Sequence, residues 1–120
     1  MAPRILYAED DSSMRDIVRD ELTREGYTVM TASDGAEAIA LIEREPFDLL
    51  LLDVRMPYKS GLDVLAFARE RKIRSRVIML TAVDDIGIAL KAIKLGANDY
   101  VTKPYALEGL LGSIAKVLSK

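Results

Sequence analysis

Residues 47–53 read Phe-Asp-Leu-Leu-Leu-Leu-Asp, and Val54-Arg55-Met56-Pro57 follow directly. Four consecutive leucines predict a strand that is buried on both faces, as in a parallel sheet covered by helices on each side. Asp53 closes the run where this strand reaches the surface. Partial burial of a carboxylate costs free energy unless the group is paired or takes part in a functional site. The run therefore predicts a parallel sheet and a candidate site at the carboxyl end of one of its strands.

A second apolar run also ends in acids. Ile5-Leu6-Tyr7-Ala8 is followed by Glu9 and Asp10. Because parallel strands place their carboxyl ends at the same edge of a sheet, we expect these two acids to converge with Asp53. A single acid at a strand end is most simply a solvated surface group. Three acids at two strand ends indicate a site.

Strand and helix patterns alternate five times along the chain. The predicted strands are residues 4–8, 27–32, 47–53, 77–80 and 100–102. The predicted helices run from Ser12 or Ser13 to Gly26, from Asp34 (with Glu37 as a capping box) to Pro46, from Gly61 through Ala68, from Asp84 or Asp85 to Gly96, and from beyond Pro104 to Leu118. Apolar positions at helical spacing include Met14, Ile17, Val18, Leu22, Ala89, Leu90 and Ile93.

This alternation predicts the α/β class, with helices on both faces of a parallel sheet. Right-handed crossovers favour a doubly wound, five-stranded, flavodoxin-like sheet of order 2-1-3-4-5. In that order a crevice opens between the first and third strands at their carboxyl ends. Those ends carry the three acids.

Composition limits the function classes. The chain of 120 residues fits one domain, and 50% hydrophobic with 30% charged residues excludes a disordered chain. A net charge of -2 gives no electrostatic footprint for nucleic acid, and no apolar run is long enough to span a membrane. The amino terminus lacks a signal-peptide core. A cytoplasmic location and no membrane contact are the default expectations.

The sequence contains no cysteine and no histidine. Disulfides, thiolate nucleophiles and thiolate metal sites are therefore excluded, as are an imidazole base and an internal phosphohistidine. Any chemistry must rest on carboxylates, hydroxyls, lysines and a hard cation.

The fourth and fifth predicted strands add polar groups at the same edge. Thr81 ends one strand, and Lys103 follows the other. Two carboxylates about 4 Å apart repel by roughly 4 kcal/mol at an effective dielectric near 20, so either some of the three take up protons or cations sit among them. Lys103 supplies one positive charge, and oxygen-only ligands favour Mg²⁺ for the rest. Such a set can bind a phosphoryl group, with Asp53 as the nucleophile. Lys103 considered alone would be a solvated surface lysine.

Four segments carry a family resemblance. They are Ile5-Leu6-Tyr7-Ala8-Glu9-Asp10-Asp11, Leu52-Asp53-Val54-Arg55-Met56-Pro57, Val77-Ile78-Met79-Leu80-Thr81-Ala82 and Gly96-Ala97-Asn98-Asp99-Tyr100-Val101-Thr102-Lys103-Pro104. In this order and at these separations, the chain from about Arg4 to Lys120 closely resembles the receiver domain of two-component response regulators, with a chemotaxis-regulator-like fold. The resemblance implies that residues 1–120 are a single receiver domain.

The resemblance implies roles for the metal-site residues. Asp53 would be the phosphorylation site, and Asp10 would bind Mg²⁺ directly together with the backbone carbonyl of Arg55. Glu9 would act on the ion through water. Aspartate is commoner at the position of Glu9, and the extra methylene of Glu9 should displace the carboxylate. Its effect on metal affinity is left open.

The remaining implied roles concern the phosphoryl group and the switch. Thr81 would donate a hydrogen bond to one phosphoryl oxygen, and Lys103 would pair with another. Tyr100 matches the aromatic position whose rotamer reports activation, although core packing also explains a tyrosine there. Tyr105 follows Pro104 where phenylalanine is usual, a change expected to be mild. Asp11 is expected to start a helix rather than to bind metal.

The implied function is a phosphorylation-activated signalling switch that promotes its own phosphorylation and dephosphorylation. A sensor histidine kinase or phosphotransfer protein would donate the phosphoryl group, since this chain has no histidine. The surface from the fourth strand to the fifth helix would then regulate an output domain or partner. That surface could also form a dimer, and direct nucleic-acid contact by this domain is not expected.

Two alternatives are open. A pseudo-receiver would keep the fold as an interaction module without phosphorylation, and Glu9 is its only support. A flavodoxin-like cofactor binder or a small phosphatase would use the same crevice, but no glycine-rich phosphate loop follows the first strand. The sequence leaves open whether this is a stand-alone regulator or a receiver from a longer one. The ending Leu118-Ser119-Lys120 lacks linker composition, which slightly favours either a complete chain or a receiver trimmed from a longer chain.

Overall fold

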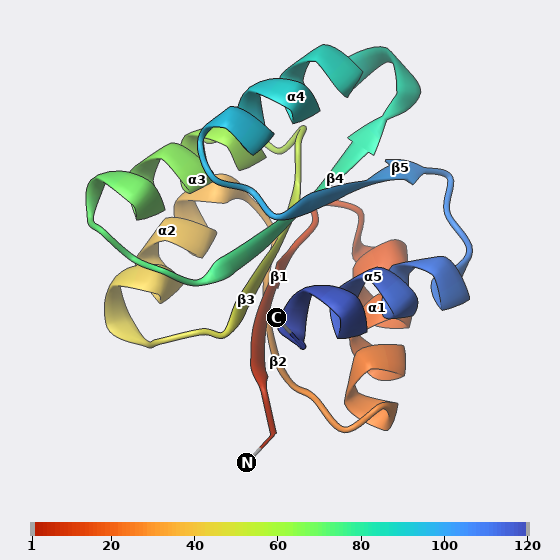
Figure 1. The fold of residues 1–120 in the computed structure, drawn as a ribbon. Helices are drawn as coiled ribbons and strands as arrows, with labels where there is room; N and C mark the ends of the chain where they lie inside the picture. Colours follow the sequence, from red (N-terminus) through yellow and green to blue (C-terminus); the bar gives the residue numbers. More distant parts are fainter. Residues whose placement is uncertain (1, 120) are drawn as a thin grey trace.

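The computed structural model describes residues 2–119 and contains one sheet of five parallel strands. The strand order is β2-β1-β3-β4-β5, which confirms the predicted doubly wound topology (Figure 1). The strands are β1 Arg4–Ala8, β2 Thr28–Ala32, β3 Leu49–Asp53, β4 Arg76–Ala82 and β5 Asp99–Lys103. Ala8 lies opposite Leu52 in the β1–β3 register, so the carboxyl ends of these central strands are level.

Helices cover both faces of the sheet, as predicted. They are α1 Ser12–Arg24, α2 Gly35–Arg44, α3 Gly61–Glu70, α4 Ile86–Lys94 and α5 Leu107–Leu118, with a short 3-10 helix, η1 Val83–Asp85, before α4. Helices α2, α3 and α4 lie on one face, and α1 and α5 lie on the other (Figure 1). Within residues 2–119, no helix has the length and apolar character that a membrane crossing needs.

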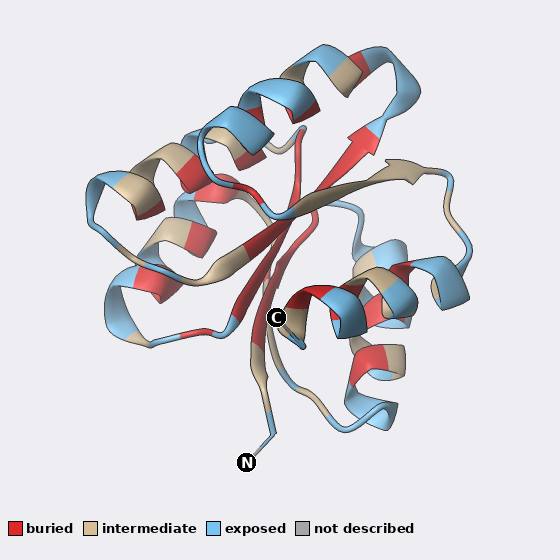
Figure 2. Ribbon diagram, in the orientation of Figure 1, coloured by how far each residue is buried: buried red, intermediate tan, exposed pale blue. Residues whose placement is uncertain are grey.

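The leucine run forms the centre of the core. Leu50 and Leu52 pack toward α2 and α3, whereas Leu49 and Leu51 pack toward α1 and α5, because successive side chains of a strand point to opposite faces. All four side chains have no exposed surface, and β3 is buried along its whole length (Figure 2). Burial on both faces explains why this strand reads as a continuous apolar run.

Two helix starts differ in part from the prediction. Asp11 starts α1, as expected, but it is also the cap in place of Ser12 or Ser13, because its side chain accepts a hydrogen bond from the backbone N–H of Met14. Asp34 caps α2 as predicted, but the expected capping box is wrong. Glu37 accepts from the backbone N–H of Ser33, one residue before the cap, at 2.6 Å.

Four of the apolar positions at helical spacing in α1 and α4 are not part of the core. Met14, Ile17, Leu90 and Ile93 are exposed. Only a narrow strip of each helix contacts the sheet: Val18 and Leu22 in α1 and the small residues Ala89 and Ala92 in α4. Helical spacing identifies the apolar side of a helix but not the width of the strip that its neighbours cover. Gly26 and Gly96, with φ of 98° and 103°, follow the ends of these two helices as predicted.

Candidate functional site

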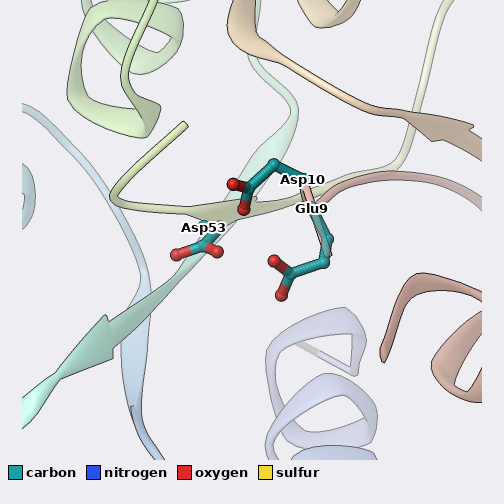
Figure 3. Close-up of side chains that lie close together, drawn as sticks. All are labelled: Glu9, Asp10 and Asp53. Atoms are coloured by element: carbon teal, nitrogen blue, oxygen red, sulfur yellow. The ribbon is translucent and has the colours of Figure 1, made fainter. Parts of the chain in front are cut away.

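The three predicted acids converge at the carboxyl edge of the sheet. Glu9 and Asp10 follow β1, and Asp53 is the last residue of the neighbouring strand β3. One carboxylate oxygen from each residue lies within 4.8 Å of the others, and the three side chains face a common space in Figure 3. The predicted convergence is confirmed, and it follows from the parallel pairing of β1 with β3.

The three acids differ in burial. Glu9 and Asp53 are buried, whereas Asp10 is exposed. Glu9 is held in place through both oxygens, because Oε2 accepts from the backbone N–H of Asp11 at 3.2 Å and Oε1 accepts from Lys103 at 2.9 Å. The cluster therefore has a rigid buried side and one side that opens to solvent.

Lys103 is the cation of the site. It is the last residue of β5, and its Nζ atom donates to Oε1 of Glu9 at 2.9 Å and to Oδ2 of Asp53 at 2.8 Å. The interpretation of Lys103 as a solvated surface lysine is therefore wrong. Although burial would lower the pKa of Lys103, its hydrogen bonds to Asp53 and Glu9 outweigh burial and raise it. Lys103 is thus a stable positive charge at the site.

The pKa of Glu9 is also raised, but here burial is the main cause. Burial raises the pKa of Glu9 and the neighbouring Asp53 raises it further, while Lys103 opposes both effects. Three acids against one lysine leave two negative charges when all groups are ionised. A donor set made only of carboxylate oxygens, with one ligand open to water, fits Mg²⁺ better than zinc or copper.

Thr81 lies on β4, which pairs with β3, and Tyr100 lies on the edge strand β5. Thr81 is fully buried on β4, one residue after Leu80, which pairs with Asp53. Its hydroxyl donates to the carbonyl of Ala82 at 3.1 Å rather than to the acids. Tyr100 on β5 is half-buried and packs against the core that faces α2, α3 and α4. In the part of the chain that the structure describes, neither side chain has a hydrogen bond to the three acids.

The loop after Asp53 is packed tightly against the site. The backbone N–H of Arg55 lies 3.4 Å from Oδ1 of Asp53, and the N–H of Gly61 donates to the carbonyl of Val54 at 2.9 Å. A Cβ atom at Gly61 would lie 2.3 Å from the backbone oxygen of Asp53. The first turn of α3 can approach Asp53 only because residue 61 has no side chain.

Two features of this region could not be predicted from the sequence. The guanidinium of Arg55 donates two hydrogen bonds to Asp85, although the residues are 30 positions apart. In addition, the hydroxyls of Tyr7 and Tyr105 are buried without a hydrogen-bond partner among residues 2–119. An acid at a predicted helix start was the only signal at Asp85, and nothing in the spacing connects it with Arg55.

The fold and its acidic crevice define an α/β domain with a carboxylate site suited to a hard cation and a phosphoryl group. The family model for the response regulator receiver domain matches residues 5–115. The chain therefore belongs to the response regulator receiver domain family. Response regulators receive phosphoryl groups from histidine kinases, so the chain is a domain of phosphorylation-regulated signalling.

Curated relatives and solved structures agree with this assignment. Response regulator MprA of Mycobacterium leprae is 38% identical over 117 residues, and the alkaline phosphatase synthesis transcriptional regulatory protein PhoP of Bacillus subtilis is 36% identical over 120 residues. The alignments cover 98% and 100% of this chain but 51% and 50% of those proteins. The chain thus spans about half the length of these relatives.

Two solved structures show the likeness of the fold. A CheY-like receiver domain protein of Methanospirillum hungatei matches with a TM-score of 0.93 and 31% identity, covering 99% of this chain and 95% of that one. The receiver domain of the Francisella response regulator 1452 matches with a TM-score of 0.90 and 30% identity, covering 98% and 97%. The predicted flavodoxin-like fold and the family resemblance are both confirmed.

Proposed function

We propose that this chain is a phosphorylation-activated switch in which Asp53 accepts a phosphoryl group from a sensor histidine kinase or phosphotransfer protein. A carboxylate oxygen of Asp53 attacks phosphorus, the P–N bond of the donor phosphohistidine breaks, and the imidazole leaves with the bonding electrons and takes up a proton. The observation that carries the proposal is the position of Lys103, whose ammonium joins Asp53 to Glu9 at the mouth of the acid cluster.

The acid cluster supports Mg²⁺ as the cofactor of this reaction. Asp10 and Asp53 would bind the ion directly with the backbone carbonyl of Arg55, and Glu9 would act through water. Bound Mg²⁺ would neutralise charge as two anions approach one another. Glu9 supports the indirect role because both of its oxygens already accept hydrogen bonds from the protein.

Lys103, Thr81 and Tyr100 would turn the new anion into a conformational signal. Lys103 would keep one phosphoryl oxygen paired, and the hydroxyl of Thr81 would leave the carbonyl of Ala82 to donate to another. The space vacated by Thr81 would admit the ring of Tyr100. A change from 1:99 to 99:1 between two arrangements requires about 5.5 kcal/mol, to which hydrogen bonds to a charged group contribute about 1.5–3 kcal/mol each.

In this function, residues 1–120 would act as a single receiver domain in the cytoplasm. Its output would pass through the β4-to-α5 surface to an output domain or partner, with dimerisation through the α4–β5–α5 face as one form of that output. Its relatives include a transcriptional regulatory protein of twice the aligned length. Any nucleic-acid contact of the whole protein would therefore belong to another domain, because this one carries a net charge of -2.

Intact-mass spectrometry with a small acyl phosphate tests the proposal. We expect the chain to gain one phosphoryl group when Mg²⁺ is present and none when a chelator removes the ion. Absence of any mass gain at millimolar Mg²⁺ would reject the proposed switch.

The alternative of a pseudo-receiver draws on one observation, the pairing of the buried Glu9 carboxylate with Lys103 at 2.9 Å. If this pair occupied both groups permanently, neither would be available to an ion or a phosphoryl group. A protein that does not bind Mg²⁺ at millimolar concentration, followed by NMR shifts, would favour this alternative.

A further inference from the structure

The Arg55–Asp85 ion pair connects the loop after Asp53 with the start of α4. Nε of Arg55 lies 2.6 Å from Oδ2 of Asp85, and Nη2 lies 2.6 Å from Oδ1. This is the bidentate geometry in which a guanidinium binds a carboxylate most specifically. The pair thus joins the β3–α3 loop to the segment between β4 and α4.

The two partners are exposed to different degrees. The side chain of Arg55 is 75% exposed, whereas that of Asp85 is only 4% exposed. A carboxylate covered to this extent is costly without a partner, so loss of Arg55 would drive it to a new position. The exposed arginine can leave the pair at little cost, because water can solvate it.

Asp85 also has a second set of donors within its own chain. It occupies the cap position of α4 but makes no side-chain hydrogen bond to the first turn of that helix. Aspartate is among the preferred residues at this position because it accepts from the free N–H groups of the first turn. Both of its oxygens instead accept from Arg55. The carboxylate therefore has two alternative uses, the ion pair and the helix cap.

Phosphorylation of Asp53 would act on both ends of the pair. A phosphoryl group brings more negative charge to a residue whose Oδ1 already faces the backbone N–H of Arg55, so it competes for the guanidinium. Thr81, four residues before Asp85, would be drawn toward the same group. Each effect favours separation of Arg55 from Asp85.

We propose that the Arg55–Asp85 pair is a restraint that holds the β4–α4 segment in its unphosphorylated arrangement, and that it opens on phosphorylation so that Asp85 caps α4. This inference rests on the proposed function and names the regulation of that site. It makes Asp85 a positioning residue that acts on α4 and does not touch the reacting atoms.

Backbone amide NMR of α4 tests the restraint in Asp85→Asn, which weakens the ion pair yet keeps a good capping residue. In the metal-free variant, we expect the α4 signals to move from the unphosphorylated positions toward those of the wild type with beryllofluoride and Mg²⁺. The variant should also bind beryllofluoride severalfold more tightly, because a restraint on the inactive arrangement opposes the ligand. Arg55→Gln breaks the pair from its exposed side and should move the metal-free signals the same way.

Glu43→Gln is the matched control, because it removes an ion pair with Arg71 between α2 and α3. It should leave the α4 signals unchanged. If the wild type responds to beryllofluoride but the α4 signals of both metal-free test variants stay at the wild-type positions, the restraint alone is overturned. A wild type that does not respond to beryllofluoride with Mg²⁺ would overturn the proposed function and the restraint together.

Discussion

The side chain of Lys103 crosses β4 to reach Asp53, and its Nζ atom lies 2.8 Å from Oδ2 of that residue. The two residues are 50 positions apart and are separated by a whole strand. Because Lys103 also contacts Glu9, one ammonium holds two buried carboxylates that would otherwise repel one another. The edge of the sheet thus holds one ammonium between two buried carboxylates, which is the arrangement that the proposed function uses.

Replacement of Lys103 by methionine should destabilise the metal-free protein by about 1–3 kcal/mol, since it leaves two buried carboxylates without their cation while the site stays partly open to water. Urea unfolding would measure the loss. Lys103→Arg is the control, because it keeps the charge and should recover much of the stability. Equal stability of the methionine variant and the wild type would show that Lys103 does not compensate the acids.

Gly61→Ala should cost about 1–3 kcal/mol in unfolding free energy, because the new methyl group would collide with the backbone oxygen of Asp53. Gly112→Ala on α5 is the matched control, since nothing lies within 4 Å of a Cβ atom there. It should stabilise the protein by about 0.5–1 kcal/mol through helix propensity. If both variants behaved alike, the close approach of α3 to Asp53 would be wrong.

Asp10→Asn should weaken Mg²⁺ binding severalfold more than Glu9→Gln does. Asp10 faces solvent and is free to bind the ion, whereas both oxygens of Glu9 already accept hydrogen bonds within the protein. Titration with Mg²⁺, followed by tyrosine fluorescence or NMR shifts, measures both affinities. Equal losses would contradict the direct role of Asp10 and the indirect role of Glu9.

Lowering the pH should reduce the stability of the folded protein, partly through protonation of Asp85. Its hydrogen bonds with Arg55 lower the pKa of Asp85 in the folded protein. A lowered folded-state pKa means that the pair contributes stability above the unfolded value, about 3.9, and loses it as the pH falls through the folded value. The wild type should therefore lose more stability than Asp85→Asn between about pH 5 and pH 3. Parallel melting-temperature curves for the two proteins would contradict this prediction.

The central part of the site was predictable because it depends on topology. Four leucines buried on both faces identify β3, and parallel pairing then brings Asp53 to the same edge as Glu9 and Asp10. Neither step needs knowledge of side-chain packing. The same reasoning identified Lys103 as a cation at that edge.

Features that depend on tertiary contacts were not predictable. Ile17 and Leu90 lie at helical spacing with buried residues, yet both are exposed, because no element within residues 2–119 covers those sides of α1 and α4. The Arg55–Asp85 pair joins two loops, where no periodicity relates the residues. Asp11 was expected to start α1, but whether Asp11 or one of the following serines caps the helix depends on one local backbone turn.

Phosphorylation of Asp53→Asn tests the central claim most directly. Wild type and variant would each be treated with a small acyl phosphate and Mg²⁺, and the gain of one phosphoryl group would be followed by intact-mass spectrometry. Asp16→Asn, at an exposed acid on α1, is the control. We predict full labelling of the wild type and of the control, with none in Asp53→Asn. Labelling of Asp53→Asn to the wild-type extent would contradict the role of Asp53 as phosphoryl acceptor.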